Sequence, residues 1–232
     1  MTPKVLFIGS IGVVAETSEI QRQAYNQALK ESHVDWVWTP EIYRKLLQRS
    51  GGQDRINMLA VATGKDFSKS EIEKIHARKT ELACATIVKE RIAPRPGLVK
   101  LIAEAKESGA KVAWVTTTGH ENTSAILEAS EGKLKKSDFD HIFHRDEAPK
   151  GKPSPDIYNA ALKHFGIKAH ECIAIEDSLN SLLASRTANI FTVVTLGAYH
   201  DENLDNIADL TLASLEKASW NDLSKRLQSK TA

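Results

Sequence analysis

Residues 172–178 of this chain read Cys-Ile-Ala-Ile-Glu-Asp-Ser, in which a short apolar run at residues 172–175 is followed by two carboxylates. An uninterrupted apolar run of this length is typical of a strand that is buried on both faces of a parallel sheet. Similar runs occur at residues 5–8 (VLFI), 112–115 (VAWV) and 190–194 (IFTVV). The sequence therefore predicts four buried strands.

Segments with helical character separate these runs. They cover residues 98–107, 155–164 and 179–186, and Gly109 and Gly166 follow the first two as plausible helix-ending residues. Strands that alternate with helices predict an α/β fold, a doubly wound parallel sheet of the Rossmann type with helices on both faces. Ligands of such sheets bind at the carboxyl ends of the strands, so the residues just after each strand are the candidate site.

The pattern changes between the first two strands, where strand-like runs disappear. Helices are predicted there at residues 19–31, 40–48 and 69–89. We therefore predict an α/β core made of residues 1–15 and 94–232, with a helical cap domain inserted at residues 16–93. The polar tail from residue 224 to residue 232 is expected to fray.

Composition narrows the classes of function. The chain has 232 residues, of which 41% are hydrophobic and 26% charged, and its 31 Lys and Arg nearly balance its 30 Asp and Glu. This balance gives no electrostatic reason to expect nucleic acid or an acidic membrane as a partner. No apolar run approaches the length of a membrane-spanning helix, the first residues lack a signal-peptide pattern, and Cys84 and Cys172 have no CxxC spacing. We expect a cytoplasmic protein.

Hydroxyl groups follow the second predicted strand. Thr116, Thr117, Thr118 and Gly119 stand between that strand and a helix predicted at residues 121–128. Hydroxyls and backbone amides in this position can hold a phosphate group. The alternative is a hydroxyl-rich turn that only caps the helix.

A basic turn precedes the third strand. Lys152 lies in the segment Lys-Gly-Lys-Pro-Ser-Pro-Asp at residues 150–156, where two prolines restrict the backbone. Lys152 could pair with a buried anion, or it could lie in a solvated basic loop.

Two adjacent carboxylates, Glu176 and Asp177, follow the third strand and precede Ser178. Carboxylates at a strand end suit a hard cation such as Mg²⁺. Alternatively, Asp177 or Ser178 caps the helix that follows.

Taken together, these motifs resemble those of the haloacid dehalogenase superfamily of phosphohydrolases. Thr116 resembles the second motif of that superfamily, Lys152 the third, and Glu176 with Asp177 the fourth. The helical segment resembles the cap of the CbbY-like, phosphoglucomutase-like branch, whose phosphatases act on xylulose bisphosphate. The residues that carry this second resemblance are Asp35 to Trp38, Tyr43 to Leu47 and Ser50 to Ile56.

The first motif departs from the family pattern. The family has Asp-x-Asp-Gly after the first strand, where the first Asp attacks phosphorus and helps to bind magnesium, and the second acts as acid and base. This chain reads Gly9-Ser10-Ile11-Gly12. Gly9 and Ile11 therefore occupy the two catalytic positions, and no catalytic residue is predicted. Ser10 is expected to point away from the site and to lack a base.

The other implied roles carry over residue by residue. The resemblance implies that Thr116, Thr117 and Lys152 contact phosphate, and that any magnesium bound by Asp177 and Glu176 is weakly held or absent. In the cap, the implied ligand contacts are Glu16, Gly51, Gly52 and Arg55, although the two glycines could instead only break a helix. Two cap positions depart from the branch, with Gln21 in place of a common His and Gln53 in place of a common Lys.

Three functions remain open from the sequence. The first is a catalytically impaired phosphatase homologue that binds a phosphorylated sugar or an inorganic anion, in a regulatory role. The second is an active magnesium-dependent hydrolase with an unorthodox nucleophile. The third is an interaction module with a vestigial pocket. The sequence predicts no cofactor other than weakly bound Mg²⁺, and it identifies no protein partner.

Overall fold

The computed structural model describes residues 2–48, 51–199 and 202–231. Its centre is a parallel sheet with the strand order β3-β2-β1-β4-β5-β6. The strands are β1 (Val5–Ile8), β2 (Lys111–Val115), β3 (His141–Phe143), β4 (Cys172–Glu176), β5 (Phe191–Thr195) and β6 (Leu210–Leu212). The predicted α/β fold with a doubly wound parallel sheet is confirmed.

Two hydrophobic layers cover the sheet because alternate side chains of each strand point to opposite faces. On one face, Leu6 and Trp114 pack with α6 (Leu98–Glu107), α7 (His120–Ala129) and α10 (Trp220–Thr231). On the other face, Phe7 and Ala174 pack with α8 (Asp156–Phe165) and α9 (Leu179–Thr187). Short 3₁₀ turns at 136–138, 145–147, 169–171, 202–206 and 215–217 complete the connections.

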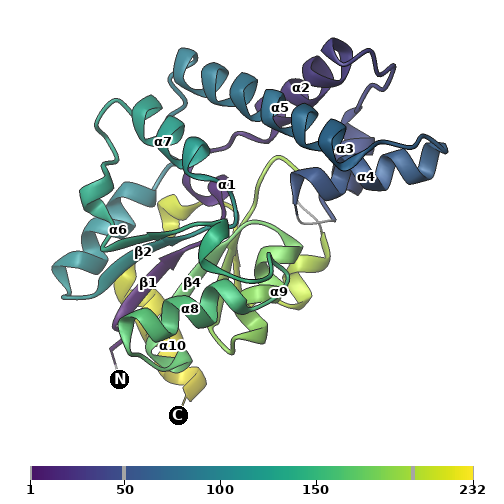
Figure 1. Cartoon of the computed structure of the whole chain (residues 1–232). Helices are drawn as coiled ribbons and strands as arrows, with labels where there is room; N and C mark the ends of the chain where they lie inside the picture. Colours follow the sequence, from purple (N-terminus) through teal and green to yellow (C-terminus); the bar gives the residue numbers. More distant parts are fainter. Residues whose placement is uncertain (1, 49–50, 200–201, 232) are drawn as a thin grey trace.

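In the described part of the segment between β1 and β2, all of the regular secondary structure is helical. After α1 (Ile11–Val14) come α2 (Ser18–Glu31), α3 (Pro40–Leu46), α4 (Gly52–Thr63) and α5 (Lys69–Lys89). Figure 1 shows α2 to α5 together on one side of the molecule, far from the two chain ends. They pack around Tyr25 and Trp38, whose rings stack 4.2 Å apart. The division into a core and a cap domain stays a prediction.

The C-terminal tail is largely helical. Residues 220–231 form α10, and Leu223 and Leu227 are buried against the core. This helix, in which two leucines spaced four residues apart give a polar segment one apolar face, was not predicted from the sequence. Residue 232 lies outside the described residues, and fraying of the tail stays a prediction. None of the described helices is long and apolar enough to cross a membrane.

Candidate functional site

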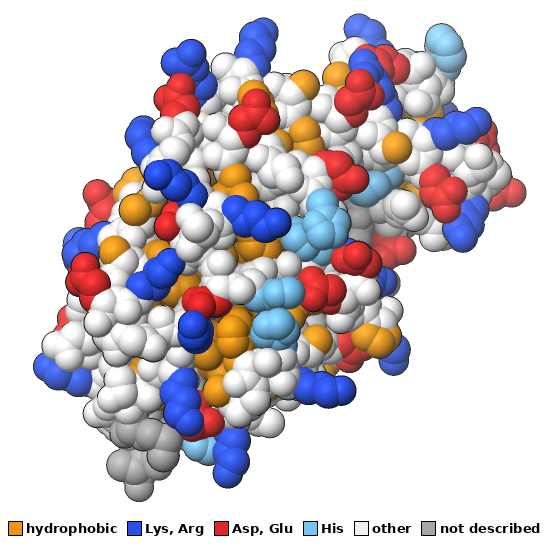
Figure 2. Space-filling model, turned by 60° about the vertical axis from the view of Figure 1, so that its left-hand side comes forward, with side chains coloured by type: hydrophobic (Ala, Val, Ile, Leu, Met, Phe, Trp, Pro, Cys, Tyr) orange, Lys and Arg blue, Asp and Glu red, His pale blue; other side chains and the backbone are white. Residues whose placement is uncertain are grey.

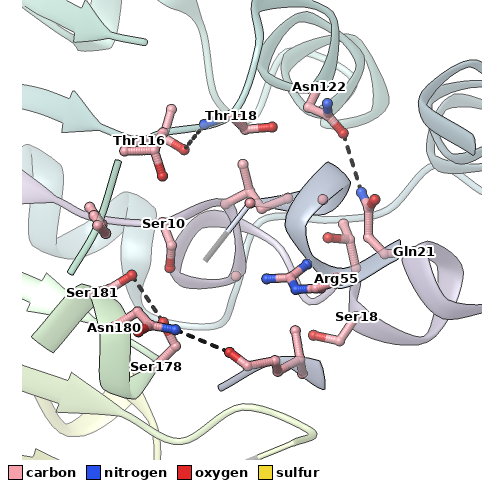
Figure 3. Close-up of a pocket in the computed structure, with 18 of the residues that line it drawn as sticks. Ser10, Ser18, Gln21, Arg55, Thr116, Thr118, Asn122, Ser178, Asn180 and Ser181 are labelled. Atoms are coloured by element: carbon pink, nitrogen blue, oxygen red, sulfur yellow. Dashed lines mark hydrogen bonds between the residues drawn. The ribbon is translucent and has the colours of Figure 1, made fainter. Parts of the chain in front are cut away.

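The strand ends meet as the sequence predicts. Ile8 of β1 lies beside Trp114 of β2 and Ile175 of β4, and the Gly9 amide donates to the carbonyl oxygen of Ile175 over 2.9 Å. A cavity of about 1630 Å³ opens beyond these ends, and helices α2 to α5 form its other wall. Figure 3 shows Arg55 reaching into this cavity from α4, with Ser10 on the opposite side.

The carboxylate of Glu176 fills the space beside Gly9. It accepts hydrogen bonds from the Lys152 ammonium (Nζ to Oε1, 2.6 Å), from the Tyr158 hydroxyl and from the Ser10 amide (N to Oε2, 3.1 Å). Glu176 and Lys152 are 0% and 3% exposed, so this is a buried ion pair. A Cβ atom on Gly9 would overlap the Glu176 carboxyl group. Glycine at position 9 therefore makes room for an anion supplied by β4.

Lys152 is thus not a solvated basic residue. Its ammonium also donates to the carbonyl oxygen of Val115 (3.0 Å) and lies 5.0 Å from the centre of the Tyr158 ring. Burial, followed by the adjacent Glu176 charge, raises the pKa of Tyr158 well above its usual value. The tyrosine therefore remains a neutral hydrogen-bond donor to Glu176.

Ser10 corrects a prediction made from the sequence. It lines the cavity, and its hydroxyl donates to the Asp177 carboxylate. The strand ends at Ile8, so the alternation of side chains that directs a strand residue away from its neighbour does not extend to position 10. Burial and then the charge of Glu176 raise the pKa of Asp177 to about 6.

The threonines after β2 lie where the sequence predicts. Thr116 and Thr117 line the cavity, and the Thr116 hydroxyl accepts a hydrogen bond from the Thr118 amide (3.2 Å; Figure 3). At the other strand end, Ser178 precedes α9 without a side-chain capping bond, and its hydroxyl donates to Ser181 (2.9 Å). Phosphate contact by Thr116 and Thr117 stays a prediction.

The strand ends do not fit a magnesium ion. Mg²⁺ requires nearly octahedral oxygen ligands and is reluctant to lose its water. Asp177 is engaged by Ser10, Glu176 is held by Lys152 and Tyr158, and positions 9 and 11 offer no carboxylate. Within the described ranges, no group of three His, Cys, Asp or Glu side chains is arranged to hold a metal.

The two cap glycines begin a helix. Gly51 precedes α4 with a φ of 93°, which favours glycine, and Gly52 is the first residue of the helix. A Cβ atom on Gly52 would overlap His76 and Tyr25, so this helix end packs tightly against α2 and α5. Both glycines and Arg55 line the cavity, and ligand contact by them stays a prediction.

Lys79 of α5 is a site residue that the sequence analysis missed. It lines the cavity, is 6% exposed, and lies 4.7 Å from the centre of the Tyr25 ring. It forms no ion pair with any described residue. Burial, and then the nearby charge of Arg55, lower its pKa to about 7. Its position could have revealed it, because it continues the helical spacing of the buried residues Ile72 and Ile75.

His76 stands one helical turn before Lys79 and also lines the cavity. Burial, followed by the charges of Lys79 and Arg55, lowers its pKa to about 4, so it is neutral at pH 7. The helical wall of the cavity includes the carboxylates of Asp54 and Glu81. It also presents Lys79, Arg55 and the amino end of α4. All three favour a negatively charged group.

Two other cap residues make contacts within the protein. The Glu16 carboxylate accepts hydrogen bonds from the amides of Ser18 (3.0 Å) and Ala198 (2.8 Å). Gln21 donates to the Asn122 side chain over 3.2 Å, which joins α2 to α7 (Figure 3). Gln21 lines the cavity, whereas Glu16 is outside the set of lining residues. Ligand contact by Glu16 stays a prediction.

Four histidines, scattered in the sequence, gather around β3. The rings of His120 and His144 lie 3.6 Å apart, and those of His141 and His164 lie 4.4 Å apart. Figure 2 shows histidine side chains grouped with acidic ones on one face of the molecule. The Thr123 hydroxyl donates to the His120 carbonyl oxygen, so it accepts from Nε2 of His144 (3.0 Å).

A family model of haloacid dehalogenase-like hydrolases matches residues 7–189. The chain belongs to this family.

Its relatives define the branch. Protein CbbY of Cereibacter sphaeroides is 39% identical over 207 residues, which are 86% of this chain and 90% of that protein. A CBBY-like protein of Arabidopsis thaliana is 32% identical over 88% of this chain and 67% of its own length. The predicted CbbY-like membership is therefore confirmed.

Solved structures also match this chain. CbbY from Rhodobacter sphaeroides, crystallised in complex with phosphate, superposes with a TM-score of 0.85 at 36% identity and covers 93% of this chain and 96% of its own. A variant of that protein in complex with xylulose-(1,5)bisphosphate gives a TM-score of 0.86 at the same identity and coverage. A β-phosphoglucomutase from Clostridium difficile, at 17% identity, shares the fold with a TM-score of 0.82.

Proposed function

We propose that this chain binds a phosphorylated sugar or a similar organic anion in the cavity and does not hydrolyse it. One observation carries the proposal: positions 9 and 11 are Gly and Ile, and the space beside Gly9 is filled by the Glu176 carboxylate, itself bound to Lys152. Phosphate-monoester hydrolysis requires rate enhancements of up to about 10²¹-fold. A site without the attacking carboxylate and its acid cannot supply them.

The charges of the helical wall support binding of an anion. Lys79 and Arg55 lie close enough for each positive charge to disfavour the other, and Lys79 has no ion-pair partner among the described residues. Keeping a buried ammonium charged is costly unless an anion accompanies it. An anionic ligand between Lys79, Arg55 and the first turn of α4 would remove this cost.

The relatives support the ligand class. Structures of CbbY from Rhodobacter sphaeroides hold phosphate and xylulose-(1,5)bisphosphate. We carry over to this chain the phosphorylated sugar as a class, without the identity of the sugar. We retain Thr116 and Thr117 as hydrogen-bonding residues at the strand ends and Arg55, Gly51 and Gly52 as ligand contacts on the helical wall.

The second candidate is an active hydrolase with a different nucleophile, because the Ser10 hydroxyl donates a hydrogen bond to Asp177 inside the cavity. In such an enzyme the Ser10 oxygen would attack phosphorus, and Asp177 would take the hydroxyl proton and return it to the sugar oxygen as the P–O ester bond breaks. A carboxylate whose pKa is about 6 is a weak base for an alcohol, however. No fitting metal site compensates for this weakness at the described strand ends. We therefore favour binding without turnover.

Two assays on the same purified protein test the proposal. Turnover is measured on a panel of sugar monophosphates and bisphosphates with Mg²⁺, and the melting temperature is measured with the same compounds in EDTA. We expect no phosphate release and a rise in melting temperature with at least one sugar phosphate. Turnover that disappears in Ser10→Ala would establish the hydrolase instead. The absence of both turnover and a thermal shift would favour a vestigial pocket.

A further inference from the structure

We propose that Glu176 is a specificity-determining residue that closes the strand end of the cavity to phosphate. Resting on the proposed function, this inference adds the orientation and class of the ligand. The ligand presents uncharged hydroxyl groups to Ser10, Asp177 and Thr116. Its single anionic group lies at the helical wall, between Lys79 and Arg55.

Glu176 occupies the space in which a phosphate-contacting side chain or a ligand would otherwise lie at the strand end. The Glu176 carboxyl group lies against Gly9, where any side chain at position 9 would begin. It is held there by three donors, from Lys152, Tyr158 and the Ser10 amide. A buried carboxylate with this many partners is fixed in place, because moving it would leave the buried Lys152 ammonium without its ion-pair partner. The strand end therefore contains a permanent anion of its own.

The charges at the strand ends also disfavour a phosphate group. Two cations line the cavity at the described strand ends, Lys152 and Arg145. The Lys152 ammonium is bound to Glu176 and to the Val115 carbonyl oxygen. The Arg145 guanidinium donates to the Ala148 carbonyl oxygen. A phosphate approaching Lys152 would have to compete with Glu176 and would lie beside Asp177 as well. Like charges at several Å repel even near a protein surface. This part of the cavity is therefore unfavourable for a phosphate group.

Hydroxyl groups suit the same surface. Ser10 and Thr116 offer hydroxyl oxygens, and the Asp177 carboxylate lines the same part of the cavity and accepts hydrogen bonds. A sugar hydroxyl can donate to Asp177 or to the Ser10 oxygen, and it can accept from the Thr116 hydroxyl. The favoured ligand is thus a monophosphate with a hydroxyl-bearing end, rather than a bisphosphate.

The main test measures binding of inorganic phosphate by calorimetry in EDTA. Four proteins are compared: the wild type, Glu176→Gln, Lys152→Met, and the double variant. Glu176→Gln keeps the shape of the side chain but removes the negative charge that is paired with Lys152. We expect it to bind phosphate at least about tenfold more tightly than the wild type, and the gain to disappear in the double variant. A folded Glu176→Gln protein without this gain would overturn the inference.

Sugar phosphates separate this inference from the proposed function. We expect a pentose monophosphate to bind the wild type and Lys152→Met equally, and a pentose bisphosphate to bind no more tightly than the monophosphate. If Lys152→Met abolishes binding of the monophosphate, the inference fails while the proposed function stands. If the wild type hydrolyses the monophosphate, the proposed function itself fails.

A stability measurement keeps the inference testable if Glu176→Gln does not fold. Gly9→Ala places a methyl group against the Glu176 carboxyl group, so we expect the melting temperature to fall by about 4–10 °C. The same substitution in a Glu176→Ala background is the matched control, and there it should cost much less. An equal loss in both backgrounds would show that Glu176 does not occupy the space beside Gly9.

Discussion

At the scale of single residues, Lys79 and Lys152 are two buried lysines with opposite surroundings. Lys152 has a carboxylate partner, whereas Lys79 faces an aromatic ring and another cation. Lysine is rarely buried without a partner in a folded protein. The difference supports the proposals that Lys152 holds the structure of the strand ends and that Lys79 recognises a ligand.

The lowered pKa of Lys79 makes stability depend on pH. Below pH 7 the residue is charged in both the folded and unfolded states, so the folded state bears the full cost of burial. Between pH 7 and pH 10.5 the unfolded state retains a proton that the folded state has lost, so stability rises with pH. We expect Lys79→Met to stabilise the protein by about 1–4 kcal/mol at pH 6.

Urea denaturation at pH 6 and pH 9.5 measures this effect. The advantage of Lys79→Met should shrink at the higher pH, where the wild-type lysine is neutral when folded. Lys150→Met, at an exposed lysine, is the matched control and should show no such dependence. A constant advantage at both pH values would contradict the lowered pKa.

The affinity for an anionic ligand should also depend on pH, in the opposite direction to stability. A neutral Lys79 attracts an anion poorly, so affinity for a sugar monophosphate is expected to weaken above pH 7. Lys79→Arg keeps its charge and should flatten the profile between pH 7 and pH 9. Calorimetry across this range measures both profiles, and identical slopes would argue against Lys79 as the anion contact.

At the scale of elements, α5 carries Lys79 and begins with a complete capping box. The Ser68 hydroxyl accepts from the Glu71 amide (3.3 Å), and the Glu71 carboxylate accepts from the Ser68 amide (2.8 Å). We expect Ser68→Ala to destabilise the protein by about 1 kcal/mol, since it leaves a helix amide without its partner.

Thermal denaturation monitored by circular dichroism measures this loss. Ser70→Ala is the matched control, because Ser70 is exposed on the same helix, two residues further on. It should leave the melting temperature nearly unchanged. Equal effects of the two substitutions would show that the capping box does not stabilise α5.

The elements also show what the sequence could predict. A continuous apolar run is a clear sequence signal for a buried strand, so β1, β2, β4 and β5 were predicted nearly residue for residue. The edge strands β3 and β6 have three residues each and no such run, and they were missed. Their extended form depends on pairing with β2 and β5, which is a tertiary interaction.

The site was predictable in part. Motif spacing located Thr116, Lys152, Glu176 and Asp177 and showed that positions 9 and 11 lack carboxylates. The partner of Lys152 could not be predicted, because pairing with a ligand and pairing with Glu176 require the same residues. Lys79 was missed because a lysine in a charged helix normally faces solvent.

At the scale of the whole molecule, the cavity lies between the strand ends of the sheet and helices α2 to α5. Asn180 of α9 donates to the carbonyl oxygens of Leu47 (3.2 Å) and Gln48 (3.1 Å), and Tyr199 packs on Tyr43. A ligand that reaches from Ser10 to Lys79 adds contacts to both parts. It should therefore stabilise the whole fold.

A saturating sugar monophosphate, at about 100 times its Kd, is expected to stabilise the protein by about 2.7 kcal/mol. This corresponds to a rise in melting temperature of about 5–10 °C for a chain of this size. At the same ligand concentration Arg55→Met should reduce the rise. Lys45→Met, an exposed lysine on α3 outside the cavity lining, should not. Equal rises in all three proteins would place the ligand elsewhere.

Phosphorus NMR of a sugar monophosphate mixed with stoichiometric protein and Mg²⁺ tests binding without turnover in a single sample. We predict that the monoester resonance shifts or broadens as protein is added, and that no inorganic phosphate signal grows over a day. An inorganic phosphate signal that increases in proportion to the protein, and is lost in Ser10→Ala, would contradict the central claim.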